Sequence, residues 1–191
     1  PALVPMVVKD GKTKELQGLS LRNIEINIKQ NNKKSIYKEF GEINFTVFGV
    51  SGPLILKGSR FIEKGKSYTA HVDLKPALSI GELDKRIQKD FSKYINNKFK
   101  DSLNDLLPQK IIPMIINMSN INEEKMVNEI TKEERKNLVN TLKDFTFDID
   151  GLRPLAEGIV TRGGVDVKEI DPSTMKSKII DNLSFCGEVM D

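Results

Sequence analysis

The hydrophobic period of this chain changes twice, and these two changes constrain its fold more than any other feature of the sequence. Before Pro76, apolar and polar residues alternate along three short runs: 21–28, 42–50 and 67–74. From Ser79 to Asp144, apolar residues recur every three or four positions, which is the period of an amphipathic helix. Alternation returns at Phe145. The sequence therefore predicts a helical unit inserted between two stretches of β structure.

The β stretches are best explained as one antiparallel barrel. Ile24, Ile26 and Ile28 fall on one face of the first predicted strand. The turn-forming letters QNNKKS, FGE and EKGKS leave linkers too short for crossover helices, so neighbouring strands are expected to run antiparallel. We therefore predict an α+β fold, in which a small, discontinuous β-barrel of about six strands carries a helical insertion. The predicted boundaries are 1–77 and 145–171 for the barrel and 78–144 for the insertion.

Two capping boxes mark helix starts inside the insertion. Ser79 precedes Glu82 by three residues, and Thr131 precedes Glu134 in the same way. In such a box, the two side chains satisfy free backbone amides of the first turn. A stripe that repeats every four residues follows the first box: Leu83, Ile87, Phe91 and Ile95. Further short helices are predicted at 101–107, 110–118 and 123–130, and at Pro53, where Ser51 would be the cap.

Composition excludes several classes of protein. A chain of 191 residues with 38% hydrophobic side chains can bury a core for one domain or two small ones. It contains no run of about 18 apolar residues, the length that spans a membrane, so no membrane partner is expected. The single cysteine, Cys186, cannot form an internal disulfide and fits a cytoplasmic location. With only one histidine, His71, the sequence also predicts no metal site.

The charge pattern argues against nucleic acid as a partner. Lys and Arg number 30 against 27 Asp and Glu, which gives a formal net charge of +3. Basic residues alternate with acidic ones, as in DKRIQKD and TKEERKN. This pattern is typical of a solvated surface of mixed charge, whereas a nucleic-acid interface gathers its positive charge on one face.

Three short motifs favour structural over catalytic roles. The letters GKS at 65–67 resemble the end of a phosphate-binding loop, but Arg60 stands where that loop needs glycine, so a hairpin turn is predicted. His71 lies within a predicted strand and has no nucleophile in a recognisable pattern around it. Cys186 lies in an apolar run and is expected to be a small buried side chain.

The last stretch of the chain carries the most specific pattern. The letters IVTRGGVDVKEIDPSTMKSKIIDNLSFCGEVMD, at 159–191, combine a glycine pair with a strand-like run that ends in glycine and glutamate. This stretch resembles the segment that re-enters the flavin-binding domain of BaiN-like flavoproteins, which are NAD(P)/FAD-dependent oxidoreductases, also called the aminoacetone oxidase family. Three earlier stretches agree with that family: PALVPM at 1–6, LQGLSLRNI at 16–24 and GEINFTVFGVSGPLIL at 41–56.

The resemblance implies that the chain is the substrate-side insert of a flavoprotein, a β-barrel that carries a small helical bundle. Residues 172–191 would be the first piece of the returning, Rossmann-like FAD-binding domain. The sequence has no GxGxxG loop, which in such a domain holds the FAD pyrophosphate on a helix N-terminus. We therefore expect a fragment that binds no FAD and has no activity on its own. In the parent enzyme, the implied partners are the missing FAD-binding domain, FAD, NAD(P)H as electron donor and a small-molecule substrate.

The resemblance also assigns individual residues. Those matched to cofactor contacts are Gly163, Gly164, Gly187, Glu188 and Asp191. Those matched to the substrate side are Ser51 and Gly52, and no residue is assigned a catalytic role. Val47 departs from the pattern, because family members commonly have histidine there. One alternative stays open, a freestanding module of barrel and helices that binds nucleic acid. A basic stripe with exposed aromatic residues would favour that alternative.

Overall fold

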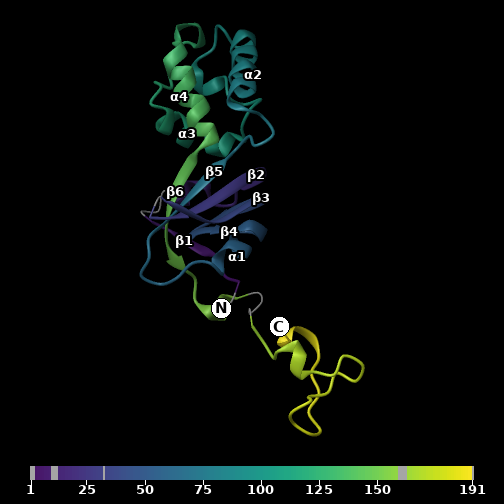
Figure 1. Cartoon of the computed structure of the whole chain (residues 1–191). Coiled ribbons are helices and arrows are strands. Elements are labelled where there is room, and N and C mark those ends of the chain that lie inside the picture. Colours follow the sequence, from purple (N-terminus) through teal and green to yellow (C-terminus); the bar gives the residue numbers. More distant parts are fainter. Residues whose placement is uncertain (1–2, 10–12, 32, 159–162, 191) are drawn as a thin grey trace.

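Six strands of the computed structural model close into one β-barrel. The structure describes residues 3–9, 13–31, 33–158 and 163–190. In barrel order, the strands are β1 (Met6–Val8), β4 (Gly49–Ser51), β3 (Lys34–Thr46), β2 (Ser20–Gln30), β5 (Tyr68–Asp73) and β6 (Phe145–Leu152). Figure 1 shows this barrel between the helices and the C-terminal segment. The predicted fold class, a small barrel that carries helices, is confirmed.

The strand that follows the helices completes the barrel. β6 pairs with β5 on one side, where Ala70 lies opposite Phe147, and with β1 on the other, where Met6 lies opposite Leu152. All six pairings of the barrel are antiparallel. The two β stretches therefore form one sheet, although the whole helical unit separates them in the sequence.

The inward face of β2 agrees with the prediction and extends it. Ile24, Ile26 and Ile28 are buried in the barrel core. Leu21 is buried too, because the register of β2 against β3 shifts between Leu21 and Ile24, where Asn23 adopts a φ of 56°. Such a bulge breaks the strict alternation of a strand, so both flanking side chains point inward.

β3 is longer than the sequence predicts. It continues through the letters FGE at 40–42, where a turn is predicted. The predicted strand 42–50 is instead divided between β3 and β4 by a tight turn at Val47 and Phe48. Pairing with β2 along most of its length stabilises β3, and this long-range contact outweighs the weak local turn signal of Gly41.

Helix α1 (Pro53–Ser59) has a different cap from the one predicted. Its N-cap is Gly52, whereas Ser51 is the last residue of β4 and accepts no capping hydrogen bond. The φ of Gly52 is 97°, a conformation that glycine adopts without strain. Leu54 and Ile55 of this helix are buried in the same core as the barrel strands.

The segment 78–144 contains three α-helices: α2 (Ile80–Lys93), α3 (Ile112–Ser119) and α4 (Lys132–Lys143). Both predicted capping boxes are present, at Ser79 with Glu82 and at Thr131 with Glu134. Two of the predicted short helices are wrong. The segments 101–107 and 123–130 form 3₁₀ and other turns instead.

The apolar stripe of α2 is also shorter than predicted. Leu83, Ile87 and Phe91 are buried, but the helix ends at Lys93, and Ile95 is 49% exposed. No helix among the described residues is both long and apolar enough to cross a membrane.

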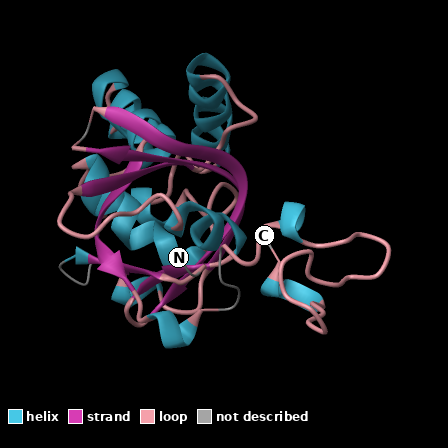
Figure 2. Cartoon of the chain, turned by 60° about the horizontal axis from the view of Figure 1, so that its bottom comes forward, coloured by secondary structure: helices cyan, strands magenta, loops and turns pink. Residues whose placement is uncertain are grey.

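Residues 163–190 form a looped segment beside the barrel (Figures 1 and 2). The barrel sheet ends at Leu152, short of the boundary at 171 that the sequence predicts. The described part of this tail has isolated bridges, such as Val165 with Met190, in place of the predicted strand at 184–189. Cys186 is exposed rather than buried. A strand of a parallel sheet needs flanking strands, and the described residues supply none here.

Candidate functional site

A cavity of about 760 Å³ opens at the end of the barrel where β6 ends. Its volume lies within the usual range of small-molecule sites, about 300–1,000 Å³. Three segments line it: Val4, the stretch from Ile62 to Lys66 together with Tyr68, and the stretch from Ile149 to Leu155. The cavity therefore lies beside both the residue that leads into β1 and the residues that follow β6.

Tyr68 holds one wall of this cavity in place. The backbone amide of Glu63 donates to the Tyr68 hydroxyl over 3.1 Å. Lys66 pairs with the Glu63 carboxylate at 2.6 Å across the same turn, and Gly65 has a φ of 83°. The letters GKS thus form a turn, as predicted, but this turn leads from α1 into β5 and is not a hairpin between two strands.

Arg153 fixes the opposite wall. Its backbone amide donates to the carbonyl of Pro5 over 3.0 Å, and its Nε donates to Glu157 Oε2 over 2.9 Å. The guanidinium carbon also lies 4.6 Å from the centre of the Phe48 ring. Hydrogen bonds from Arg153 hold the pKa of the Glu157 carboxyl below its usual range. The charge of Arg153 is therefore already balanced within the protein.

The lining of the cavity supplies binding groups rather than a nucleophile. It consists of aliphatic side chains, glycines, one tyrosine and a few charged residues, and it contains no serine, cysteine or histidine. Of its charged side chains, Lys64 and Asp150 form no ion pair with another described residue. An apolar ligand with one or two polar groups fits such a lining.

The two residues matched to the substrate side lie on the neighbouring part of the barrel. Ser51 pairs with Asn44 at the end of β4, and Gly52 begins α1. A Cβ on Gly52 would lie 3.1 Å from the Asn44 side-chain nitrogen, so the site is closely packed. Neither residue lines the cavity. Val47 is 52% exposed in the turn between β3 and β4.

Two of the stretches matched to the cofactor lie side by side in the tail. The Val165 amide donates to the Val189 carbonyl over 2.9 Å, directly after the glycine pair. A Cβ on Gly164 would lie 2.3 Å from that same carbonyl oxygen, so only glycine allows this approach. Gly163 and Gly187 both have positive φ, 87° and 71°. The Glu188 side chain and Asp191 lie outside the described residues.

His71 has a structural environment. Its Nδ1 lies 2.7 Å from Oδ1 of Asp144, the residue that ends α4. This contact joins the middle of β5 to the point where the helices return to the barrel. His71 does not line the cavity at the end of β6.

No local sequence pattern indicates the cavity, for a physical reason. Its lining comes from three segments that are brought together only when β6 closes the barrel between β1 and β5. None of these segments has a motif that marks a binding site. The sequence predicts a turn at Gly65 but wrongly makes it a hairpin, and this turn gives no sign of a neighbouring cavity.

Comparison with known proteins assigns the chain by its barrel and helices. Residues 1–160 match the family model described as "HI0933-like protein barrel and H2TH domain". The chain is 31% identical over 190 residues to the ribosomal RNA dihydrouridine synthase of Haemophilus influenzae, and the match covers 100% of this chain and 45% of that protein. The protein of the same name from Escherichia coli is 26% identical over 189 residues, which are 99% of this chain and 45% of that protein.

A third relative has a different substrate in its name. The 3-dehydro-bile acid delta(4,6)-reductase of Clostridium scindens is 25% identical over 163 residues, which are 83% of this chain and 40% of that protein. The chain thus spans less than half the length of the curated relatives that it matches.

Proposed function

We propose that this chain is the substrate-side insert of a longer FAD-dependent oxidoreductase, because it belongs to the HI0933-like protein family by its barrel and H2TH domain. The position of the cavity is the observation that carries this proposal. Val4 and Leu155 both line it, so a domain attached through the segments before β1 and after β6 would face its opening. An insert in this position shapes and covers a substrate pocket.

The proposed division of labour follows from the groups present. FAD, held mainly by the attached domain, would supply the hydride chemistry, with NAD(P)H as the electron donor. The chain itself contributes binding and positioning: aliphatic walls from Ile149 and Leu152, and the polar groups of Lys64 and Asp150. In the tail, the contact of Gly164 with Val189 would let the backbone approach the flavin closely, and Glu188 would accept hydrogen bonds from its ribitol hydroxyls.

A second candidate concerns the substrate, which would be a base within RNA instead of a free small molecule. Two of the relatives are named for ribosomal RNA, and they match 99–100% of this chain. The distribution of charge favours the same candidate. Residues 1–77 contain 13 Lys and Arg against 7 Asp and Glu, an excess of six, whereas residues 145–191 contain 5 against 9. Residues 1–77, which supply five of the six barrel strands, therefore carry the positive charge of the chain.

The experiment that tests the proposal uses the full-length protein that contains this chain, purified without added flavin. We expect bound FAD, seen by its absorbance and identified after release, and oxidation of NAD(P)H. Glu188→Ala is expected to weaken flavin retention, whereas Glu169→Ala, which removes an exposed acid of the same tail, should leave it unchanged. A full-length protein without flavin would contradict the proposal, and equal retention in both variants would remove Glu188 from the cofactor contacts.

The role of the cavity has its own test. Leu155 is 72% exposed at its rim, so Leu155→Trp should fill part of the cavity without disturbing the fold. We expect this variant to raise KM for the substrate in the full-length enzyme and to leave flavin content unchanged. Ile80→Trp is the matched control, because Ile80 is 59% exposed at the start of α2 and lines no part of the cavity. The same KM for both variants would show that the substrate binds elsewhere.

A further inference from the structure

Lysines from three separate parts of the sequence gather around the tip of the β2–β3 hairpin. We call them the hairpin patch: Lys9, Lys29, Lys33, Lys34, Lys64 and Lys66. The Asn31 amide, at the tip of the hairpin, donates to the Ser67 carbonyl over 3.0 Å, which joins the hairpin to the loop before β5. Lys9, Asn31 and Lys66 line one recess of about 300 Å³. The fold therefore brings these three parts of the sequence to the same end of the barrel.

The positive charge of the hairpin patch is largely unbalanced. Among the described residues, Lys66 pairs with Glu63, and no ion pair involves the other five lysines. Two further acids border the recess, Asp148 and Asp150, and Asp148 accepts a hydrogen bond from the Thr69 hydroxyl over 2.8 Å. The patch thus has six lysines, against the three carboxylates of Glu63, Asp148 and Asp150.

The helical unit, by contrast, has almost no net charge. Five of its acids receive ion pairs from lysines or arginines within the unit: Asp84, Asp90, Asp105, Glu124 and Glu134. Its sequence, residues 78–144, holds 12 Lys and Arg against 11 Asp and Glu. The net positive charge of this chain therefore lies in residues 1–77, the stretch that contains the hairpin patch.

The patch borders the substrate-side cavity, and one exposed aromatic ring lies farther along β3. Lys66, Tyr68, Ile149 and Asp150 line both the recess and the larger cavity, and Lys64 lines the cavity too. Phe40 is 57% exposed on β3, six residues beyond Lys34, or about 20 Å at the usual strand rise. Among the described residues, it is the one aromatic ring in the set of exposed large hydrophobic side chains.

We infer that the hairpin patch binds the phosphate backbone of RNA and guides it toward the cavity. The inference rests on the proposed function in its second form, in which the substrate is a base within RNA. Unpaired lysines release the counterions of a polyanion, which favours binding without sequence preference. An exposed ring gives single-stranded bases a surface for stacking. The sequence hides this surface, because lysines alternate with acids along the chain and meet only in the folded barrel.

The test measures fluorescence polarisation of a labelled single-stranded RNA of about 20 nucleotides with the 191-residue chain at several KCl concentrations. The triple variant Lys29→Gln, Lys33→Gln, Lys34→Gln should bind at least about tenfold more weakly at low salt. It should also lower the slope of log affinity against log salt by about 2, since each lost phosphate contact on a single strand changes the slope by about 0.7.

The matched control removes the same charge from the helices. Lys85, Lys89 and Lys136 are exposed, and no ion pair among the described residues involves them, so their triple Gln variant should bind RNA like the unchanged chain. Equal losses in the two triple variants would overturn the inference, since the chain would then attract RNA only by its overall charge. A loss confined to the control would assign RNA to the helices instead.

Two further outcomes separate this inference from its alternatives. Binding to vesicles of anionic phospholipid but not to RNA would overturn it in favour of a membrane surface. The flavin measurement on the full-length protein keeps the two proposals distinct. A flavoprotein whose barrel binds no RNA would contradict only the hairpin patch, and an RNA-binding chain from a protein without flavin would contradict only the proposed function.

Discussion

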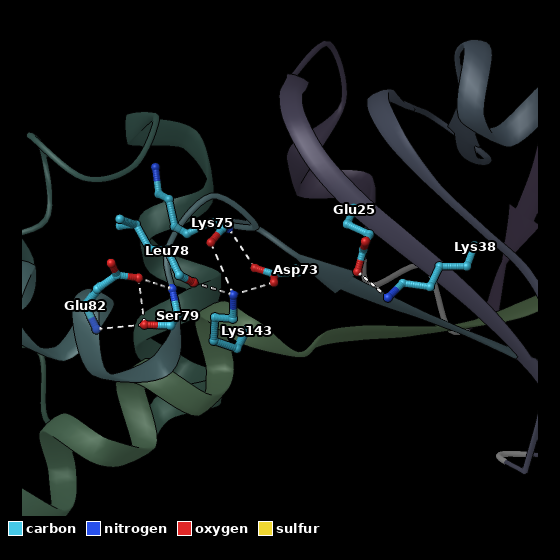
Figure 3. Close-up of polar contacts among 8 residues, drawn as sticks. All are labelled: Glu25, Lys38, Asp73, Lys75, Leu78, Ser79, Glu82 and Lys143. Atoms are coloured by element: carbon cyan, nitrogen blue, oxygen red, sulfur yellow. Dashed lines mark hydrogen bonds and ion pairs between the residues drawn. The ribbon is translucent and has the colours of Figure 1, made fainter.

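The ammonium group of Lys143 lies 2.5 Å from the carboxylate of Asp73, at the junction between the barrel and the helices. Lys143 Nζ also donates to the carbonyls of Leu78 and Lys75, over 2.8 and 3.2 Å (Figure 3). The other carboxylate oxygen of Asp73 accepts from the Lys75 amide over 2.8 Å. The Lys143 side chain, at the end of α4, thus binds three residues of the connection from β5 to α2. The two chain segments that cross between barrel and helices are joined to each other.

The first prediction is that Lys143→Met destabilises the chain by about 1–3 kcal/mol. Two carbonyls and the Asp73 carboxylate would lose their donor at a site where both ionic side chains are less than a fifth exposed. Urea unfolding followed by circular dichroism measures the effect. The matched control is Lys38→Met, which removes the exposed pair with Glu25 shown in the same view and should cost less than about 1 kcal/mol. Equal losses would show that the junction is no stronger than a surface pair.

The second prediction concerns the pH dependence of α4. A hydrogen bond from the Lys125 ammonium, followed by one from the Thr131 amide, holds the pKa of the Glu134 carboxyl below its usual range. A carboxyl with a lowered folded pKa stabilises the fold above its unfolded pKa, about 4.3, and this contribution is lost as pH falls through the folded pKa. Glu134→Gln should therefore be less stable than the unchanged chain at pH 7, with a difference that shrinks below about pH 4.

The neighbouring residue provides the control for this pH effect. Glu133 is exposed in the same first turn, and no ion pair among the described residues involves it. Glu133→Gln should therefore change the melting temperature at pH 7 by less than Glu134→Gln does. A difference between Glu134→Gln and the unchanged chain that stays constant from pH 7 to pH 3 would contradict the assignment.

The structural features that depend only on neighbouring residues could be predicted from local patterns in the sequence. The capping boxes at Ser79 and Thr131 and the buried isoleucines of β2 follow from spacing alone, and the structure has them all. The errors arose where distant contacts decide. Pairing with β2 makes β3 continuous through Gly41. The N-cap of α1 is Gly52 and not Ser51, because the chain changes direction at Gly52, directly after β4. The residues of the hairpin patch and of the cavity come together only when the barrel closes, so no local sequence pattern predicts either of them.

The third prediction tests that closure at Gly49. A Cβ on Gly49 would lie 2.3 Å from the Met6 carbonyl oxygen, a backbone atom that cannot move away without disturbing the pairing of β4 with β1. Gly49→Ala should cost more than about 2 kcal/mol of stability. Gly65→Ala is the control, because its Cβ would meet nothing within 4 Å and only the φ of 83° opposes it. That strain should cost about 1 kcal/mol. A Gly49→Ala chain as stable as Gly65→Ala would contradict the close β1–β4 contact.

The fourth prediction concerns the tail, residues 163–190. Among the described residues, its hydrogen bonds stay within the segment, such as that from the Phe185 amide to the Met175 carbonyl. Four of its apolar side chains are more than half exposed: Val167, Ile179, Ile180 and Val189. Few buried contacts and a solvent-exposed backbone are typical of segments that open easily. We therefore expect its amides to exchange hydrogen faster than those of β2 and β5 by a factor of about 100 or more in the dilute chain.

The same amides distinguish a tail that is merely open from one that lacks its partner. If residues 172–191 belong to a flavin domain, exchange at the amides of 183–189 should slow once the full-length protein holds FAD, because flanking strands and the cofactor then cover them. At high concentration of the 191-residue chain, its exposed apolar side chains should instead promote self-association, which analytical ultracentrifugation would detect. Protection of 183–189 equal to that of β2 in a dilute monomer would show that the tail is stable without any partner. Its assignment to a second domain would then have to be abandoned.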